Sequence, residues 1–259
     1  MPVSGAAVWS DDFNDGNYDG WIIEGLLAPL DDDWTYHTDG EAEIVNNELR
    51  FTGPQIFRND TVAVHESSVA YGNWSIDVNV GPIYNSSNHT HVYFIDPRPV
   101  EDVPNMGTGF KGYDIMIYPA PWTIEVPDWL VSEDETAPSF LLIRRPGIVI
   151  LGSITVGEIN GLQHIEITRD ETGRFKVYIN DTLRIEAVDN TWKTSQSFYL
   201  ISESGIGFDN VIVRDDVIPT NEPTTTTPPP GIPGELLVIL IVAPVALVLA
   251  LVIIAKRRK

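Results

Sequence analysis

Residues 162–187 read LQHIEITRDETGRFKVYINDTLRIEA, and this stretch decides the fold class. Apolar and polar side chains alternate in it from Ile165 onward, in three short runs. The runs are separated by ETG at 171–173 and by Asn180-Asp181, which are turn-forming sequences. A period of two gives an extended chain one apolar face and one polar face. The stretch therefore predicts a three-stranded antiparallel meander that buries one face and exposes the other.

The same alternation extends over residues 11–216, with turn signals between the runs and no convincing amphipathic helix. Many short strands with recurrent turns are typical of an all-β sandwich or barrel. The chain has no cysteine, which excludes disulfides, thiolate catalysis and zinc–thiolate sites. A domain of about 200 residues is large enough to bury a core without such cross-links. Further strands are expected at residues 73–80, 89–95, 113–118, 140–145 and 206–213.

Residues 236–255, LLVILIVAPVALVLALVIIA, carry a different signal. This run of 20 residues has no charge, and the basic residues KRRK follow it at 256–259. At 1.5 Å per residue the run forms a helix of about 30 Å, which matches the hydrocarbon core of a bilayer. Basic residues favour the cytoplasmic side of a membrane. The predicted fold is thus an all-β sandwich ectodomain plus one C-terminal transmembrane α-helix.

The stalk between sandwich and anchor contains PTNEPTTTTPPPGIP, and its prolines favour an extended chain of about 3 Å per residue. A single-pass protein of the cell membrane is expected, with the sandwich outside the cell and a short cytoplasmic C-terminus. The predicted parts are a lead-in at 1–10, the sandwich at 11–216, the stalk at 217–235, the transmembrane helix at 236–255 and the basic tail at 256–259.

The start of the chain shows no signal peptide, which conflicts with this topology. Three explanations stay open: a misassigned or trimmed start, a tail-anchored protein whose globular part is cytosolic, or an export signal of another kind. Asn-x-Ser/Thr sequons support an external location, because they are acceptors for N-linked glycans. The candidate glycosylation sites are Asn59, Asn73, Asn85, Asn88 and Asn180.

The charge of the chain is strongly negative. Four of its 16 cations lie in the tail, so the remaining 12 face 37 acidic residues, a net charge of −25. Such a domain repels nucleic acid and anionic lipid headgroups, and neither is an expected partner. Calcium is the natural candidate for a bound cation. Because the acids are scattered along the chain, the favoured explanation of the charge is that it keeps a surface protein soluble.

Two sequence patterns near the ends of the sandwich occur together. The first, residues 11–21, reads DDFNDGNYDGW, and Trp34 and NNEL at 46–49 follow it. The second, residues 205–213, reads GIGFDNVIV. In this order the patterns resemble the concanavalin A-like lectin/glucanase superfamily, in particular its laminin-G-like jelly-roll modules. The stalk, anchor and basic tail are similar to those of archaeal cell-surface proteins.

The resemblance implies that the first and last strands lie side by side, so that Asp12 and Asp209 approach each other. It also implies a structural calcium ion, and two close carboxylates repel unless a cation lies between them. The expected ligands are Asp12, Asp209 and Asn14. The alternative is that Asp209 accepts hydrogen bonds from the backbone amides of a turn.

The hydrolytic branch of this superfamily carries E-x-D-x-E or E-x-D-x-x-E on one strand, and neither spacing is present. The nearest cluster, Glu133-Asp134-Glu135, lies between prolines in a predicted loop. His89 and His91 would share one strand face as a pair of metal ligands, without an evident third. No catalytic residue is therefore predicted, and the chain is not expected to be an enzyme.

Sugar-binding sandwiches stack exposed aromatic rings on the apolar face of a pyranose. Trp122 and Trp129 lie in a proline-rich predicted loop and are the candidate ligand-binding residues. Packing inside the protein is the alternative role for both. The favoured function is a membrane-anchored lectin-like or adhesion module for carbohydrate or a cell-envelope partner. A structural envelope protein without a ligand pocket is the alternative, and a degenerate glycoside-active enzyme is a weaker one.

Overall fold

The computed structural model describes residues 7–27, 35–37, 41–52, 59–80, 90–100, 111–118, 139–146, 148–156, 159–202 and 206–216. These residues form β-strands, turns and bends, and contain no α-helix. Among them there is no helix of the length and apolar character that a membrane crossing requires. The predicted stalk and transmembrane segment, residues 217–255, lie outside the described residues, as does the basic tail.

The strands are β1 (Trp9–Asp11), β2 (Ile22–Leu27), β3 (Thr35–His37), β4 (Ala42–Val45), β5 (Glu48–Phe51), β6 (Asn59–Glu66), β7 (Gly72–Val80), β8 (Thr90–Asp96), β9 (Gly112–Ile117), β10 (Phe140–Arg145), β11 (Val149–Ile154), β12 (Gly161–Arg169), β13 (Arg174–Ile179), β14 (Thr182–Val188), β15 (Ser197–Ser202) and β16 (Ile206–Arg214).

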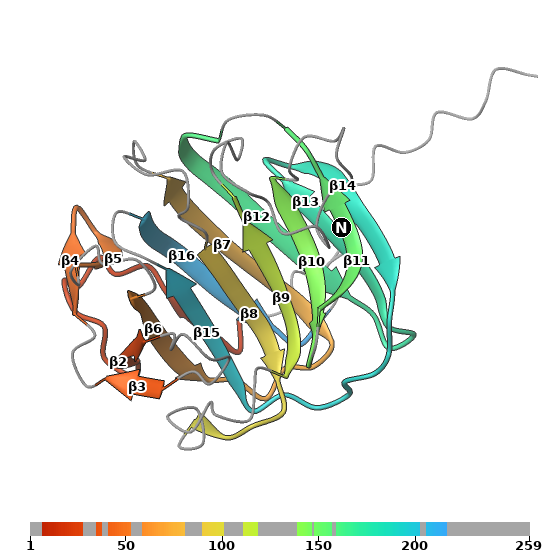
Figure 1. Cartoon of the computed structure of the whole chain (residues 1–259), viewed down its shortest axis with the longest axis horizontal. Helices are drawn as coiled ribbons and strands as arrows, with labels where there is room; N and C mark the ends of the chain where they lie inside the picture. Colours follow the sequence, from red (N-terminus) through yellow and green to blue (C-terminus); the bar gives the residue numbers. More distant parts are fainter. Residues whose placement is uncertain are drawn as a thin grey trace, which may run out of the picture. The chain divides into compact units, whose positions relative to one another are not determined.

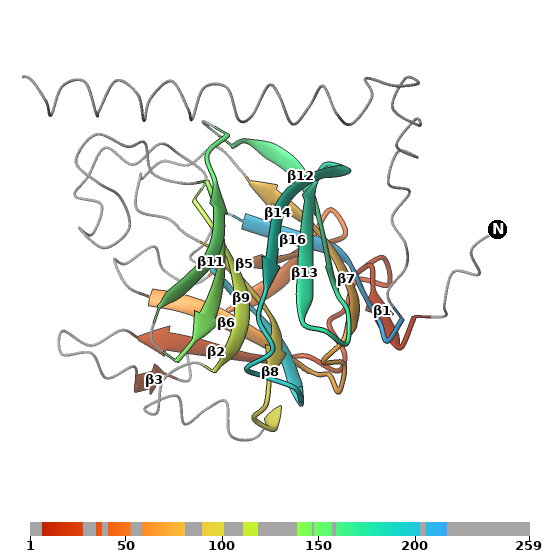
Figure 2. The ribbon, with the colours of Figure 1, turned by 90° about the vertical axis from the view of Figure 1, so that its right-hand side faces the viewer.

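The strands form two sheets that face each other, and the predicted all-β sandwich is confirmed (Figures 1 and 2). Sheet A has the order β14-β13-β12-β7-β16-β5-β4, and β1 also pairs with β16. Sheet B has the order β11-β10-β9-β8-β15-β6-β2-β3 and lies in front in Figure 1. Neighbouring strands in these orders run antiparallel, as in jelly-roll sandwiches.

The predicted meander is present as β12, β13 and β14. Ile165 pairs with Ile179 across the first two strands, and both side chains are buried. Asn180 and Asp181 form the second turn with φ values of 49° and 61°. Two consecutive positive φ angles are those of a type I′ hairpin, which Asn and Asp tolerate better than most residues. The turn chemistry read from the sequence therefore sets the register of this hairpin.

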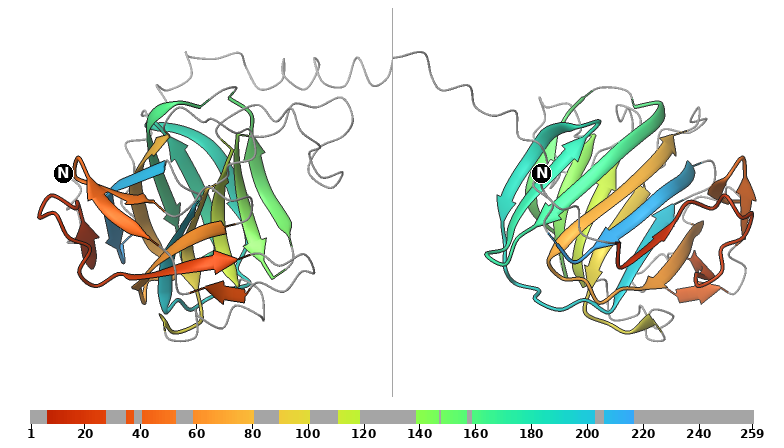
Figure 3. Two further views of the ribbon diagram at one scale, coloured as in Figure 1. Left: turned by 60° about the vertical axis from the view of Figure 1, so that its left-hand side comes forward. Right: turned by 180° about the vertical axis from the view of Figure 1, so that it is seen from behind.

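Strand β16 lies inside sheet A and has neighbours on both sides (Figure 3). One side pairs with β7. The other side pairs with β5 at Gly207 and Phe208, and then with β1 from Val211 to Val213. The expectation that the first and last strands lie side by side is therefore confirmed.

The main core fills the space between the sheets and is rich in aromatic side chains. Phe13 is fully buried and Trp21 is 7% exposed, so the opening sequence pattern anchors its segment to the core. Sheet B differs from an ordinary sandwich sheet because its outer face is also buried. Two further clusters of buried residues lie there, one around Tyr93 and Tyr199 and one around Met116 and Leu141.

Candidate functional site

The outer face of sheet B carries ionisable and phenolic side chains that are shielded from solvent. We call this set the sheet B outer cluster. Most of its members are under a tenth exposed, which is uncommon for charged residues without a structural or functional reason. The cluster consists of His91, Tyr93, Asp96, Arg98, Asp114, Tyr118, Arg145 and Tyr199.

The strand register brings six of these residues together from four strands, and Arg98 and Tyr118 lie just after β8 and β9. Asp114 of β9 lies opposite Tyr93 of β8, and Tyr93 lies opposite Tyr199 of β15. On the other side, Asp114 lies opposite Ile143 of β10. Because successive side chains on a strand alternate between faces, this row points away from the main core. The Tyr93 and Tyr199 rings stack with centroids 4.5 Å apart.

One end of the cluster is a closed ion pair. The Arg98 guanidinium donates from Nε to Asp96 Oδ1 at 3.0 Å and from Nη2 to Asp96 Oδ2 at 2.6 Å. The Tyr199 hydroxyl also donates to Asp96 and accepts from Arg98 Nη2 at 3.0 Å. Burial acts to lower the pKa of Arg98, but the hydrogen bond with Asp96 raises it overall. The Asp96 carboxylate and the Arg98 guanidinium therefore form hydrogen bonds with each other and with the Tyr199 hydroxyl inside the protein.

The other end of the cluster is incompletely paired. Asp114 Oδ2 lies 2.7 Å from His91 Nδ1 and 3.8 Å from Arg145 Nη2. Among the described residues, neither Asp114 Oδ1 nor Arg145 Nε has a hydrogen-bond partner. Burial and the negative charge of Asp114 hold the pKa of the Tyr93 phenol well above its usual value, so Tyr93 stays protonated. The arrangement thus offers an acceptor and a donor beside two stacked aromatic rings.

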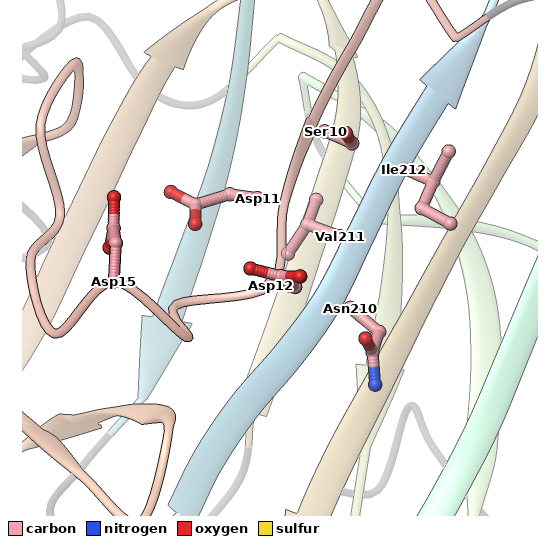
Figure 4. A pocket seen from close by; sticks show the side chains of 7 residues that line it. All are labelled: Ser10, Asp11, Asp12, Asp15, Asn210, Val211 and Ile212. Carbon is pink, nitrogen blue, oxygen red and sulfur yellow. The ribbon is translucent and has the colours of Figure 1, made fainter.

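A second candidate site lies where β1 meets β16. A hollow of about 330 Å³ is lined by Ser10, Asp11, Asp12, Asp15, Asn210, Val211 and Ile212 (Figure 4). The acids around it mostly bind backbone N–H groups two residues on. Asp12 accepts from the Asn14 N–H and Asp15 from the Asn17 N–H. Asp11 accepts from the Phe13 N–H and from Trp21 Nε1, so both of its oxygens are used.

Asp209, the third predicted calcium ligand, lies near this edge but bonds to its neighbour. Its Oδ1 accepts the Asn210 N–H at 2.7 Å, and its Oδ2 accepts the Asn210 side-chain N–H at 3.2 Å. Burial raises the pKa of Asp209, and the negative charges of Asp77, Glu48 and Asp12 raise it further. The negative charge of Asp12 therefore contributes to the raised pKa of Asp209. This agrees with the pairing of β1 with β16.

The raised pKa of Asp209 predicts the sign of a stability change. A carboxylate whose pKa is higher in the folded state costs stability above that pKa, and the cost disappears as the pH falls below the unfolded-state value. We expect Asp209→Asn to raise the melting temperature at pH 7 by about 1 to 3 °C, because the amide keeps the Oδ1 acceptor without the charge. The gain should vanish near pH 3. A lowered melting temperature at pH 7 would contradict this account.

The acids at this edge do not by themselves complete a calcium site. Calcium takes about six to eight oxygen ligands. The described residues contain no group of three or more acidic or histidine side chains placed to hold a metal. Asn14 is exposed, and its backbone N–H donates a hydrogen bond to Asp12 Oδ1. Backbone carbonyls or water would have to supply most of a coordination shell between Asp12 and Asp209.

The remaining predicted site residues fall into three groups. Trp122 and Trp129 lie outside the described residues, as do Asn85, Asn88 and the acidic cluster at 133–135. Asn59 begins β6, and Asn180 is exposed at the β13–β14 turn. Asn73 does not fit a glycan acceptor, because it is 1% exposed and its Nδ2 donates to Glu166 Oε1 at 2.5 Å.

Sequence reasoning missed most of the sheet B outer cluster. The sequence offers His91 only in a pair with His89 that lacks an evident third metal ligand. The structure places His91 against Asp114, and His89 lies outside the described residues. Asp114 stood in a predicted strand, in a position that an ordinary solvent-facing acid would take. The available signal was the density of aromatic and charged residues in the runs 90–98 and 112–118.

Comparison with solved structures shows a shared fold. A Bacillus subtilis protein of unknown function with a galectin-like fold superposes with a TM-score of 0.53 at 11% identity, over 84% of this chain and 99% of that one. The potassium-bound Emp46p carbohydrate recognition domain gives 0.50 at 9% identity, over 77% and 90%. The Bacillus subtilis carbohydrate-binding module CBM66 gives 0.47 at 16% identity, over 75% and 95%.

No protein-family model and no curated protein sequence matches the chain. At identities of 9–11% the two structures with the higher TM-scores establish the fold alone. The chain therefore has a β-sandwich of the galectin-like fold.

Proposed function

We propose that the domain is a lectin-like carbohydrate-binding module, displayed at the cell surface by the apolar segment at 236–255. The observation that carries the proposal is the sheet B outer cluster. Ligand sites combine aromatic and apolar walls with a few charged or amide groups that fix orientation, and this cluster supplies both. The fold is shared with the Emp46p carbohydrate recognition domain, which supports the proposal by analogy.

A glycan array probed with the full chain in a sugar-free detergent tests the proposal. We expect binding to a defined subset of glycans. The double variant Trp122→Ala/Trp129→Ala should bind at least about tenfold more weakly, because stacked aromatic side chains are frequent hot spots. Its melting temperature should stay within a few degrees of the parent value. A folded double variant with unchanged affinity would remove both tryptophans from the site.

We also propose that the domain binds without hydrolysing its ligand. The two carboxylates of the sheet B outer cluster are each engaged, Asp96 by Arg98 and Asp114 by His91. Glycoside hydrolysis needs a pair of carboxyl groups free to act as acid and as base or nucleophile. New reducing ends released from a bound oligosaccharide would revive the glycoside-active alternative.

A structural calcium ion between Asp12 and Asp209 is a further part of the proposal. It is supported by the negative charges that raise the pKa of Asp209, since a cation would relieve them. The ion would stabilise the β1–β16 edge and supply no chemistry. Millimolar calcium should raise the melting temperature of the parent chain and not that of Asp209→Asn. Equal shifts in both, or no shift in either, would exclude this ion.

The proposed location is supported by the apolar segment at 236–255 and the basic residues after it, and it has its own test. Protease added to intact cells should degrade the sandwich, and the segment 236–259 should stay with the membrane. Protection in intact cells and loss after lysis would place the domain in the cytosol. Absence of binding to every glycan, together with capture of an envelope protein, would favour the structural alternative.

A further inference from the structure

Strands β11 and β14 are the edges of the two sheets on one side of the sandwich (Figure 1). In the described part of the chain, β11 pairs with β10 alone and β14 with β13 alone. The two edges meet, since a Cβ atom added at Gly152 of β11 would lie 2.4 Å from Ile185 Cγ2 of β14. An open edge presents unpaired backbone N–H and C=O groups, to which a further strand can add.

The sequence of β11 lacks the usual protection of an open edge. Proteins commonly place charged side chains or proline on such a strand. Strand β14 has one charge of each sign, but residues 149–154 of β11 read VILGSI, without a charge or a proline. Ile148, Val149 and Ile150 are 37–42% exposed. An exposed apolar edge strand is typical of a surface that another chain covers.

Exposed apolar residues are concentrated on this side of the sandwich. Nine large apolar side chains are exposed among the described residues, and five of them lie on β11, on β14 or directly before β11. The two on β14 are Leu183 and Val188. Val188 precedes Asp189, whose carboxylate binds Arg144 at 2.5 Å, and Arg144 lies opposite Val149. Val149 and Val188 therefore lie at the same end of this edge.

The local charge of the edge indicates which partner it fits. Residues 1–255 carry a net charge of −25, so two copies of the chain repel each other over most of their surface. Strands β11, β13 and β14 carry three cations and one acid. With Asp170, Glu171 and Asp181 of the adjoining turns, the edge stays within one charge of neutrality. Two copies therefore repel each other less here than elsewhere.

We propose that β11 is a dimerisation strand, which pairs with β11 of a second copy of this chain. Two identical strands related by a two-fold axis through a joint sheet run antiparallel. Sheet B then continues from one copy into the other. The exposed apolar residues 148–150 become buried in the interface, and Leu183 and Val188 lie beside it. The inference does not depend on which ligand the domain binds.

Sedimentation velocity of the full chain in a density-matched detergent, over a range of concentrations, tests the dimer. We expect the parent chain to dimerise reversibly. Val149→Lys and Ile150→Lys each bring two charges into the interface, one from each copy, and should raise the dimer dissociation constant at least about tenfold. Leu162→Lys is the matched control, because Leu162 is an exposed apolar residue of β12, outside the edge strands. It should dimerise as the parent chain does.

A distance between spin labels identifies the face. The chain has no cysteine, so Ser153→Cys takes a single label per copy. Ser153 lies opposite Leu141, which belongs to the outer face of sheet B, so the label leaves the strand edge free. In a dimer joined at β11 the two labels should lie within about 25 Å, because a six-residue strand is about 20 Å long. Labels at Glu43→Cys, on β4 at the other end of sheet A, should lie further apart.

Two results would overturn the dimerisation strand. One is a parent chain that stays monomeric at every concentration. The other is parent-like dimerisation of both lysine variants, since another face or the segment 236–255 would then hold the copies together. Circular dichroism shows whether the variants fold. If both lysine variants unfold, the label distance at Ser153 decides, because it is measured on a chain with the apolar edge intact.

Discussion

Replacing Arg169 with methionine is expected to lower the free energy of unfolding by about 3 to 5 kcal/mol. The side chain is fully buried, and its guanidinium lies 4.6 Å from the Tyr71 ring centroid and 4.9 Å from those of Tyr113 and Phe175. These contacts are cation–π interactions, which strengthen when solvent is excluded. Methionine has a similar length, so the substitution removes the charge and the donors with little change in volume.

The hydrogen bonds of Arg169 explain most of the expected loss. Nη1 donates to the Ala70 carbonyl at 2.8 Å, and Nη2 donates to the Asp189 carbonyl at 3.1 Å and to Asn190 Oδ1 at 3.2 Å. The guanidinium thus links its own strand, β12, to the segments that contain Ala70 and Asp189–Asn190. Methionine would leave these acceptors in a buried site without donors.

Chemical denaturation at neutral pH measures the effect, and Arg174→Met is the matched control. Arg174 lies one strand away and pairs with Glu186 at 3.1 Å on the surface. Its replacement should cost less than about 1 kcal/mol, as exposed ion pairs do. Similar losses of unfolding free energy in the two variants would show that the contacts of Arg169 do not stabilise the fold.

Gly112→Ala is expected to cost about 4 kcal/mol or more. A Cβ atom at Gly112 would lie 1.6 Å from the Ile95 carbonyl oxygen. Because this oxygen belongs to the backbone, the clash can be relieved only by moving the neighbouring strand. The residue also has φ of +101°, which side chains other than glycine rarely adopt. The added methyl group must therefore push β9 away from β8 at the bulge between Tyr93 and Ile95.

Gly161→Ala separates the steric effect from the backbone effect. Gly161 also has positive φ, +70°, but no atom lies within 4 Å of its added Cβ. Only backbone strain applies there, and we expect a loss of about 1 to 2 kcal/mol. Thermal denaturation followed by circular dichroism compares the two variants. Equal losses would mean that the contact with Ile95 is relieved by a small shift.

The sequence predicted those parts of the fold that depend on neighbouring residues. The β12–β13–β14 meander follows from strict alternation and from the Asn180-Asp181 turn, and both are local properties. The pairing of β1 with β16 is a long-range contact, and only the resemblance to jelly-roll modules indicated it. Phe13 and Trp21, which belong to the first of the patterns that carry this resemblance, are buried.

The sheet B outer cluster could not be predicted in this way. Its members lie on or just after β8, β9, β10 and β15, which span residues 90–202 of the sequence. Which residues share a row depends on strand order and on bulges that shift the register, such as the one between Tyr93 and Ile95. Alternation shows that Asp114 and Ile115 point to opposite faces. It does not show that both faces of this sheet are buried.

The position of β16 has a mechanical consequence. The chain leaves the described domain directly after this strand, at Asp216. A pull applied along β16 at this end would load its hydrogen bonds to β7, β5 and β1, which lie across the strand direction. Bonds loaded in this shear geometry must break together, whereas a strand at a sheet edge peels away one bond at a time. A domain built this way resists tension applied along its last strand.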